Sequence, residues 1–158
     1  MKKAAFLLAA LLCAGGVSMA KIPVDDAALG GISPGVTKDY VISIYGEPEE
    51  GKIENAWAWG PNSKSQVIKY GNTVSMNCVS DNNGPMVVVM IYISANNGFS
   101  TPRGIHVGST EREVRDAYGT PDLNSHNDLW YKTINNGMNL VFHMKNGKVN
   151  SISVGWNA

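Results

Sequence analysis

One pattern occurs twice in this chain of 158 residues, and it constrains the fold more than any other feature. Residues 31–48 read GISPGVTKDYVISIYGEP, and residues 104–121 read GIHVGSTEREVRDAYGTP. An internal repeat indicates that one structural unit is built twice. The agreeing positions are ones with conformational or packing roles. They include Gly31/Gly104, Ile32/Ile105, Gly35/Gly108, Val41/Val114, Tyr45/Tyr118, Gly46/Gly119 and Pro48/Pro121.

Each copy predicts a short helix with a defined start and end. Thr37 and Thr110 suit the N-cap position, and Glu113 completes a capping box in the second copy. Apolar residues follow at spacings of three and four, which places them on one face of a two-turn helix. A glycine then ends the helix, and a proline two residues later prevents its continuation. The apolar residues are Val41, Ile44 and Tyr45, then Val114, Ala117 and Tyr118; the stops are Gly46 with Pro48 and Gly119 with Pro121.

Three strand-like segments follow each helix, separated by glycine- and asparagine-rich turns. They cover residues 65–70, 73–79 and 86–94 in the first copy, and residues 128–133, 138–144 and 148–155 in the second. The pattern predicts an α+β protein of two tandem repeats, each a short helix or helix pair packed on its own three-stranded antiparallel sheet. We expect the repeats to span residues 21–98 and 99–158, with an extra helical turn at residues 25–29.

Residues 1–20 have the pattern of a secretory signal peptide. Lys2 and Lys3 precede an apolar run, and small residues precede a cleavage point after Ala20. Lipidation at Cys13 is disfavoured, because Leu12 is bulky where a lipoprotein signal needs a small residue. We therefore expect a periplasmic or secreted protein.

Charge bounds the possible partners. The chain has 13 basic and 13 acidic residues, and loss of Lys2 and Lys3 leaves 11 basic residues with no basic block. This argues against nucleic acid and against a polybasic membrane contact, because both depend on clustered Lys and Arg. Cys78 is the one cysteine left after residue 20. We interpret it as a small apolar core residue, the alternatives being intermolecular pairing or a catalytic thiol.

The sequence carries little that indicates catalysis. His106, His126 and His143 show no metal-ligand spacing, and there is no GxSxG elbow. A Ser/His/Asp triad stays possible, since its members can be distant in the sequence. We expect a non-catalytic protein with no cofactor and no metal.

Aromatic residues are the candidate contacts with a partner protein, because exposed Trp and Tyr commonly anchor interfaces. Trp57 and Trp59 alternate around Ala58, so both indoles would face one way in an extended segment. They lie where the first copy is longer than the second. The alternative is that they cover the sheet and complete a small core. The full candidate set is Trp57, Trp59, Tyr70, Tyr92, Trp130 and Trp156.

The Gly-x-Thr-x-x-x-Val pattern, short helix, Gly-x-Pro and antiparallel strands resemble the SmpA/OmlA (BamE-like) fold. The duplicated plan is similar to the tandem repeats of β-lactamase inhibitory protein. The resemblance implies a non-catalytic exported module of the cell envelope that binds another protein, or alternatively a secreted enzyme inhibitor. It assigns no interface residues, because the matching positions are structural ones. The oligomeric state stays open.

Overall fold

The computed structural model describes residues 21–134 and 137–156, so the predicted signal peptide, Cys13 and part of the turn at residues 135–137 lie outside it. Strands make up 42% of the structure and helices 14%, which makes the protein predominantly β. The first part contains η1 (Val24–Asp26), α1 (Lys38–Tyr45), β1 (Glu49–Glu50), β2 (Glu54–Asn55), β3 (Lys64–Tyr70), β4 (Val74–Ser80) and β5 (Val87–Ile93). It is followed by α2 (Glu111–Tyr118), β6 (Leu123–Ser125), β7 (Asp128–Lys132), β8 (Met138–Lys145) and β9 (Lys148–Trp156).

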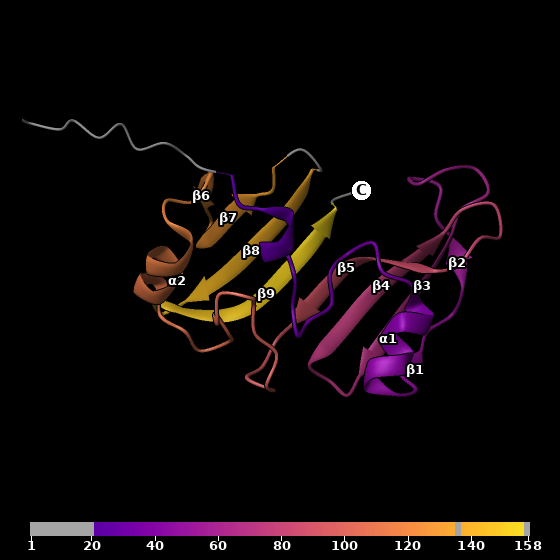
Figure 1. The fold of residues 1–158 in the computed structure, drawn as a ribbon, viewed down its shortest axis with the longest axis horizontal. Coiled ribbons are helices and arrows are strands. Elements are labelled where there is room, and N and C mark those ends of the chain that lie inside the picture. The colour runs from indigo at the N-terminus through magenta and orange to yellow at the C-terminus, as the bar shows by residue number, and fades with distance from the viewer. Residues whose placement is uncertain (1–20, 135–136, 157–158) are drawn as a thin grey trace, which may run out of the picture.

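The strands form one nine-stranded antiparallel sheet with the order β1-β3-β4-β5-β9-β8-β7-β6, and β2 also pairs with β3 (Figure 1). The two halves meet where Met90–Ile93 of β5 pair with Ile152–Gly155 of β9. The prediction of an α+β fold of two tandem helix-on-sheet repeats is therefore wrong. Local sequence patterns identify the individual strands, but they do not reveal that the last strand of one half pairs with the last strand of the other half.

The resemblance to the SmpA/OmlA (BamE-like) fold is overturned by the same observation. A mostly-sheet protein with a single continuous antiparallel sheet is not an assembly of helix-on-sheet repeats. The repeated sequence pattern specifies local geometry around each helix, and that geometry does recur. It does not specify the architecture into which the two copies are built.

Both helices begin as the sequence predicts. The Thr37 hydroxyl accepts from the backbone N–H of Tyr40, and Thr110 forms a capping box with Glu113. The Glu113 carboxylate accepts from the Thr110 N–H at 2.6 Å, and these hydrogen bonds hold the pKa of Glu113 below its usual value. The caps satisfy amide groups that a helix start leaves without partners.

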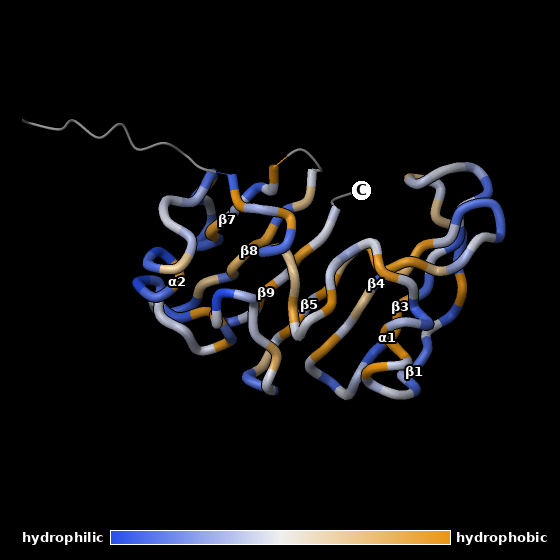
Figure 2. Tube along the Cα trace, in the orientation of Figure 1, coloured by the Kyte–Doolittle hydropathy of each residue, from blue (hydrophilic) through white to orange (hydrophobic). Residues whose placement is uncertain are grey.

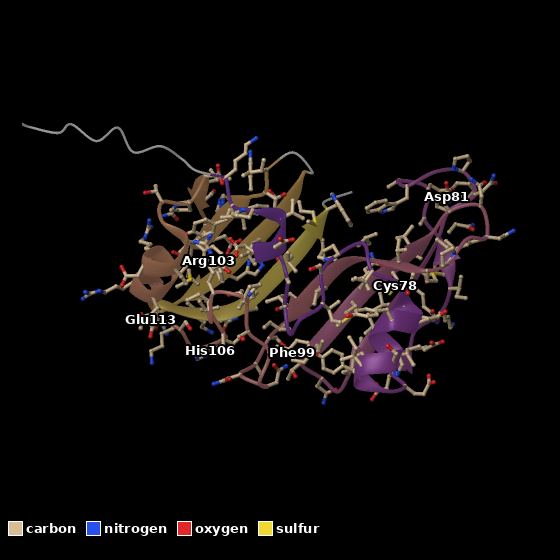
Figure 3. The ribbon with its side chains drawn as sticks, viewed as in Figure 1. Cys78, Asp81, Phe99, Arg103, His106 and Glu113 are labelled. Atoms are coloured by element: carbon tan, nitrogen blue, oxygen red, sulfur yellow. The ribbon has the colours of Figure 1, made fainter. Side chains whose placement is uncertain are left out.

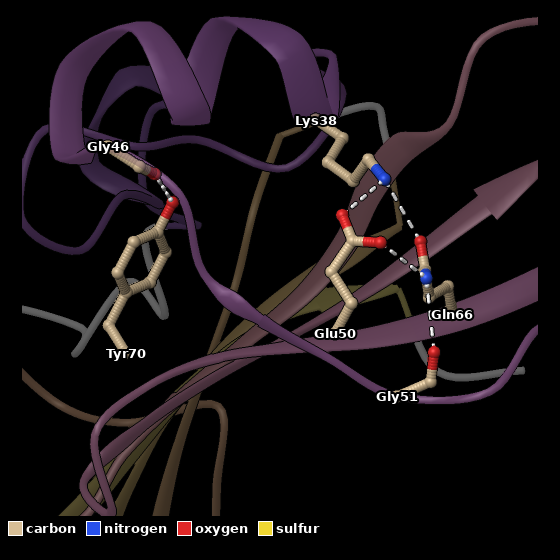
Figure 4. A network of polar contacts seen from close by, with 6 residues as sticks. All are labelled: Lys38, Gly46, Glu50, Gly51, Gln66 and Tyr70. Atoms are coloured by element: carbon tan, nitrogen blue, oxygen red, sulfur yellow. Dashed lines mark hydrogen bonds and ion pairs between the residues drawn. The ribbon is translucent and has the colours of Figure 1, made fainter.

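The helix ends are also equivalent. Gly46 and Gly119 have φ of 79° and 77°, and each carbonyl accepts a hydrogen bond from a tyrosine hydroxyl of the sheet. Tyr70 donates to Gly46 at 2.9 Å, and Tyr131 donates to Gly119 at 3.0 Å. Figure 4 shows the first of these contacts. Each helix is thus tied at its C-terminal end to a strand of the sheet, α1 to β3 and α2 to β7.

The main core lies between the helices and one face of the sheet. Val41 of α1 and Val114 of α2 are fully buried, whereas Ile44 of α1 is 48% exposed, so the predicted apolar face of α1 is only partly covered. Strands carry most of the apolar residues and α2 is largely hydrophilic (Figure 2). The largest buried side chains are Leu29, Ile32, Ile68, Met76, Ile91, Ile93, Leu129, Tyr131, Met138, Leu140, Phe142 and Ile152.

The sheet divides at the end of the β5–β9 pairing. A Cβ at Gly155 would lie 2.2 Å from the carbonyl oxygen of Val89 and 2.7 Å from Cα of Met90. Only glycine lets β9 pass this close to β5. Beyond this point the segment before α1 becomes the neighbour of β5, because the N–H of Gly35 donates to the carbonyl of Val88 at 2.7 Å.

We expect Gly155→Ala to destabilise the protein by about 2 kcal/mol or more, because the added methyl overlaps the β5 backbone. Chemical denaturation of wild type and variant measures the difference. Asn150→Ala, at an exposed position of β9, is the control and should be near neutral. Equal stability of Gly155→Ala and wild type would contradict the close approach.

We expect Gly119→Val to cost about 1 kcal/mol or more, because valine is strained at the positive φ of this helix stop. A thermal melt should show a loss of about 2–4 °C per kcal/mol for a chain of this size. Thr120→Val is the control at the next, exposed position. An unchanged melting temperature for Gly119→Val would refute the assignment.

Candidate functional site

The face of the sheet opposite the helices carries a row of side chains that runs across five strands. Cross-strand register places Tyr92 of β5 between Ser75 of β4 and Ser153 of β9, and Ser153 next to Val141 of β8. Trp130 of β7 follows Val141. Tyr92 is 38% exposed. We call this side of the sheet the outer face.

A groove of about 560 Å³ opens where β5 and β9 separate. Trp59 and Trp156, which come from opposite halves of the chain, both line it, and valines from β4 and β5 contribute further apolar surface. The groove is lined by Gly35, Ala58, Trp59, Ser63, Val79, Asp81, Val87, Val89 and Trp156. We call it the tryptophan groove.

The loop that carries Trp59 is anchored on the sheet. Ala56 is almost completely buried against Val79 and Val89, and its N–H donates to the carbonyl of Ser63 at 2.9 Å. The Ser63 hydroxyl donates to Asp81 at 3.3 Å, which links the loop to the turn between β4 and β5. Figure 3 shows Asp81 at the end of the molecule away from Arg103. These contacts hold one wall of the groove in place.

The prediction that Trp57 and Trp59 face the same way is wrong. Residues 57–59 form a turn, in which the N–H of Trp59 donates to the carbonyl of Ala56 at 2.9 Å. Trp59 therefore lines the groove and is 37% exposed, whereas Trp57 does not line it and is 68% exposed. The Trp57-Ala58-Trp59 stretch forms a turn that leads into Gly60 and Pro61, and it does not follow strand alternation.

The structure brings together only some of the predicted contact residues. Trp59 and Trp156 both line the tryptophan groove, and Trp57 lies in the adjoining turn. Tyr92 and Trp130 lie on the outer face, in the row described above. Tyr70 instead faces the helix side, where its hydroxyl ties down the end of α1.

A cluster of polar side chains at the start of α1 has a structural role. Lys38, at the start of α1, pairs with Glu50 of β1 at 2.8 Å, and Gln66 of β3 donates to Glu50 at 3.1 Å and to the carbonyl of Gly51 at 3.1 Å (Figure 4). The hydrogen bonds from Lys38 and Gln66 lower the pKa of Glu50. Because Gln66 is buried and fully engaged, the cluster fastens α1 to the edge of the sheet.

Three polar side chains that the sequence pattern did not connect meet on the outer face. Nδ1 of His143 lies 3.0 Å from Oδ1 of Asp128, and Nε2 of the same imidazole lies 3.1 Å from the hydroxyl oxygen of Ser153. They come from β7, β8 and β9. No sequence signal could have joined them, since their contact depends on strand register. Within residues 21–134 and 137–156, no group of three or more His, Cys, Asp or Glu could hold a metal ion.

Comparisons with known proteins leave the family open. No family model matches the chain, and no curated protein matches it. Among solved structures, an extracellular protein containing a SCP domain from Bacillus anthracis str. Ames is similar with a TM-score of 0.41 and 10% identity, over 78% of this chain and 44% of that one. The chain thus spans less than half of that protein, and a likeness this low supports no functional conclusion. Among the described helices, none is long and apolar enough to cross a membrane.

Cys78 behaves as the sequence interpretation expects. It is completely buried in β4 as a free cysteine, and burial raises the pKa of its thiol to about 11.

Because Cys78 is buried, we expect its reaction with a thiol reagent at pH 8 to be at least about 100-fold slower in the native protein than in denaturant. Timed labelling of residues 21–158 measures this for a single cysteine. Equal rates in both states would show that the thiol is accessible.

Proposed function

We propose that this chain is an exported protein that binds another protein, and that the tryptophan groove receives an apolar side chain of that partner. The observation that carries the proposal is that Trp59 and Trp156 line one groove together with three valines. Tryptophan is among the residues that most often dominate binding energy at interfaces. The groove volume is within the range of sites that enclose a ligand or a large side chain.

The lining supports binding over chemistry at this groove. Asp81 is its one ionisable residue, and the Ser63 hydroxyl already donates to that carboxylate. The remaining lining is apolar or glycine. Such a surface gains free energy by excluding water from a complementary apolar group.

The carboxylate of Asp81 favours a partner that carries a positive charge near the groove. It lies in the turn after β4 and is exposed, so its carboxylate can meet a cation without being removed from water. We therefore expect the partner to place an apolar side chain in the groove with Lys or Arg close by. The signal-peptide pattern of residues 1–20 supports a partner in the cell envelope or outside the cell.

Site-specific crosslinking tests this proposal. Ala58 lines the groove and is exposed, so a photoreactive amino acid at this position reports what occupies the groove. We expect crosslinking in the native envelope or culture medium to give one discrete protein adduct. Trp59→Ala should weaken binding by about 2 kcal/mol, which is roughly 30-fold, because it removes one wall of the site.

Trp130→Ala is the matched control, because Trp130 is a tryptophan of the same outer face but outside the groove lining. It should leave the adduct unchanged. An adduct that forms equally with Trp59→Ala, or no adduct at all, would contradict the proposal. Melting curves of all variants separate loss of binding from loss of fold.

A further inference from the structure

The contacts among Asp128, His143 and Ser153 form a continuous hydrogen-bonded chain on the outer face. Asp128 lies directly opposite His143 in the β7–β8 pairing, and its Oδ1 is 3.0 Å from Nδ1. Ser151 lies opposite His143 in the β8–β9 pairing, and Ser153 is two residues further along β9 on the same face. The Ser153 hydroxyl is 3.1 Å from Nε2.

The two contacts define the state of the imidazole. A carboxylate is an acceptor, so the neutral ring presents its proton to Asp128 at Nδ1 and leaves a lone pair at Nε2. That lone pair faces the Ser153 hydroxyl, which donates to it. A hydroxyl, an imidazole and a carboxylate in this order have the roles of a nucleophile, a general base and a group that orients the base. Such a set is identified by geometry, whatever the order of its members in the sequence.

The position of the Asp128–His143–Ser153 chain in the sheet favours reactivity. All three residues lie in paired strands, Asp128 at the first residue of β7 and His143 next to a β-bulge of β8, so the strand pairing positions their side chains. The side chains of His143 and Asp128 are 32% and 25% exposed, and Ser153 is half-buried. A small molecule can therefore reach the hydroxyl. Tyr92, directly opposite Ser153 on β5, supplies an exposed aromatic surface beside it.

We propose that Ser153 is a nucleophile toward small carboxylic esters, with His143 as its general base and Asp128 as the residue that positions the imidazole. The Ser153 oxygen forms a bond to the ester carbonyl carbon while its proton moves to Nε2 of His143. The bond to the leaving oxygen then breaks, and that oxygen takes the proton from Nε2 and departs as an alcohol.

Water completes the cycle. It attacks the acylated Ser153 as His143 takes a proton from it, and the carboxylic acid leaves while Nε2 returns the proton to the serine oxygen. General-base assistance of this kind contributes about 10²- to 10⁴-fold. This activity is separate from the proposed binding function, because none of the three residues lines the tryptophan groove.

Two probes test the proposal on residues 21–158. An alkyl fluorophosphonate should add covalently to one serine, which peptide mass spectrometry should identify as Ser153. 4-Nitrophenyl acetate should be hydrolysed by the wild type and not by Ser153→Ala. Ser153→Ala should abolish the adduct, and His143→Gln should slow labelling by at least about 100-fold.

Asp128→Asn keeps the shape of the side chain and should slow labelling while leaving the melting temperature close to that of wild type. Ser75→Ala is the matched control, because Ser75 flanks Tyr92 from the other side; it should label as wild type does. Labelling at another residue, an adduct that survives Ser153→Ala, equal rates in His143→Gln, or no labelling would each overturn the proposal. Trp59→Ala should label normally, so failure here and failure of groove binding are distinguishable.

Discussion

The pairing of β5 with β9 is the interaction on which the rest of the structure depends. It joins four residues of each strand and converts two short meanders into one sheet. Each meander alone would leave the edge of its last strand without partners, and such an edge promotes aggregation. Joining the two edges removes this exposure and builds a shared core of a size that neither half could bury by itself.

The same junction creates both candidate sites. Because Gly155 passes so close to β5, Trp156 is carried to the place where the strands separate, and there it faces the loop that bears Trp59. Two residues before Gly155 on β9, Ser153 lies opposite Tyr92, and its hydroxyl contacts His143 of β8. The tryptophan groove and the Asp128–His143–Ser153 chain are thus both consequences of how β9 is held between its neighbours.

The two sites differ in what they can do. The groove is apolar, wide and bordered by one carboxylate, which suits recognition of a side chain. The polar chain is small and partly exposed, and it combines a hydroxyl with a base and an orienting acid. The helix side of the molecule, by contrast, is occupied by structural contacts. Arg103 pairs with Asp26 at 2.6 Å and lies 5.0 Å from the ring centre of Tyr118, which fastens η1 to α2.

Local chemistry made part of this structure predictable from sequence. Thr110 with Glu113 specifies a helix start, and Gly119 specifies its end, because the interactions that decide both lie within a few residues. The six longer strands after the two helices were recognisable for the same reason. Residues 57–59 show the limit of local pattern, since a two-tryptophan alternation fits a strand as well as it fits the turn that the chain adopts.

The caps, the helix stops and the approximate strands follow from the amino-acid sequence alone, because each depends on neighbours along the chain. Long-range packing sets the pairing of β5 with β9, the placement of Trp59 and Trp156 in one groove, and the contacts among Asp128, His143 and Ser153. These contacts join residues far apart in the sequence, and strand register decides which side chains meet. Register is set by the packing of the whole sheet, so no segment carries it alone.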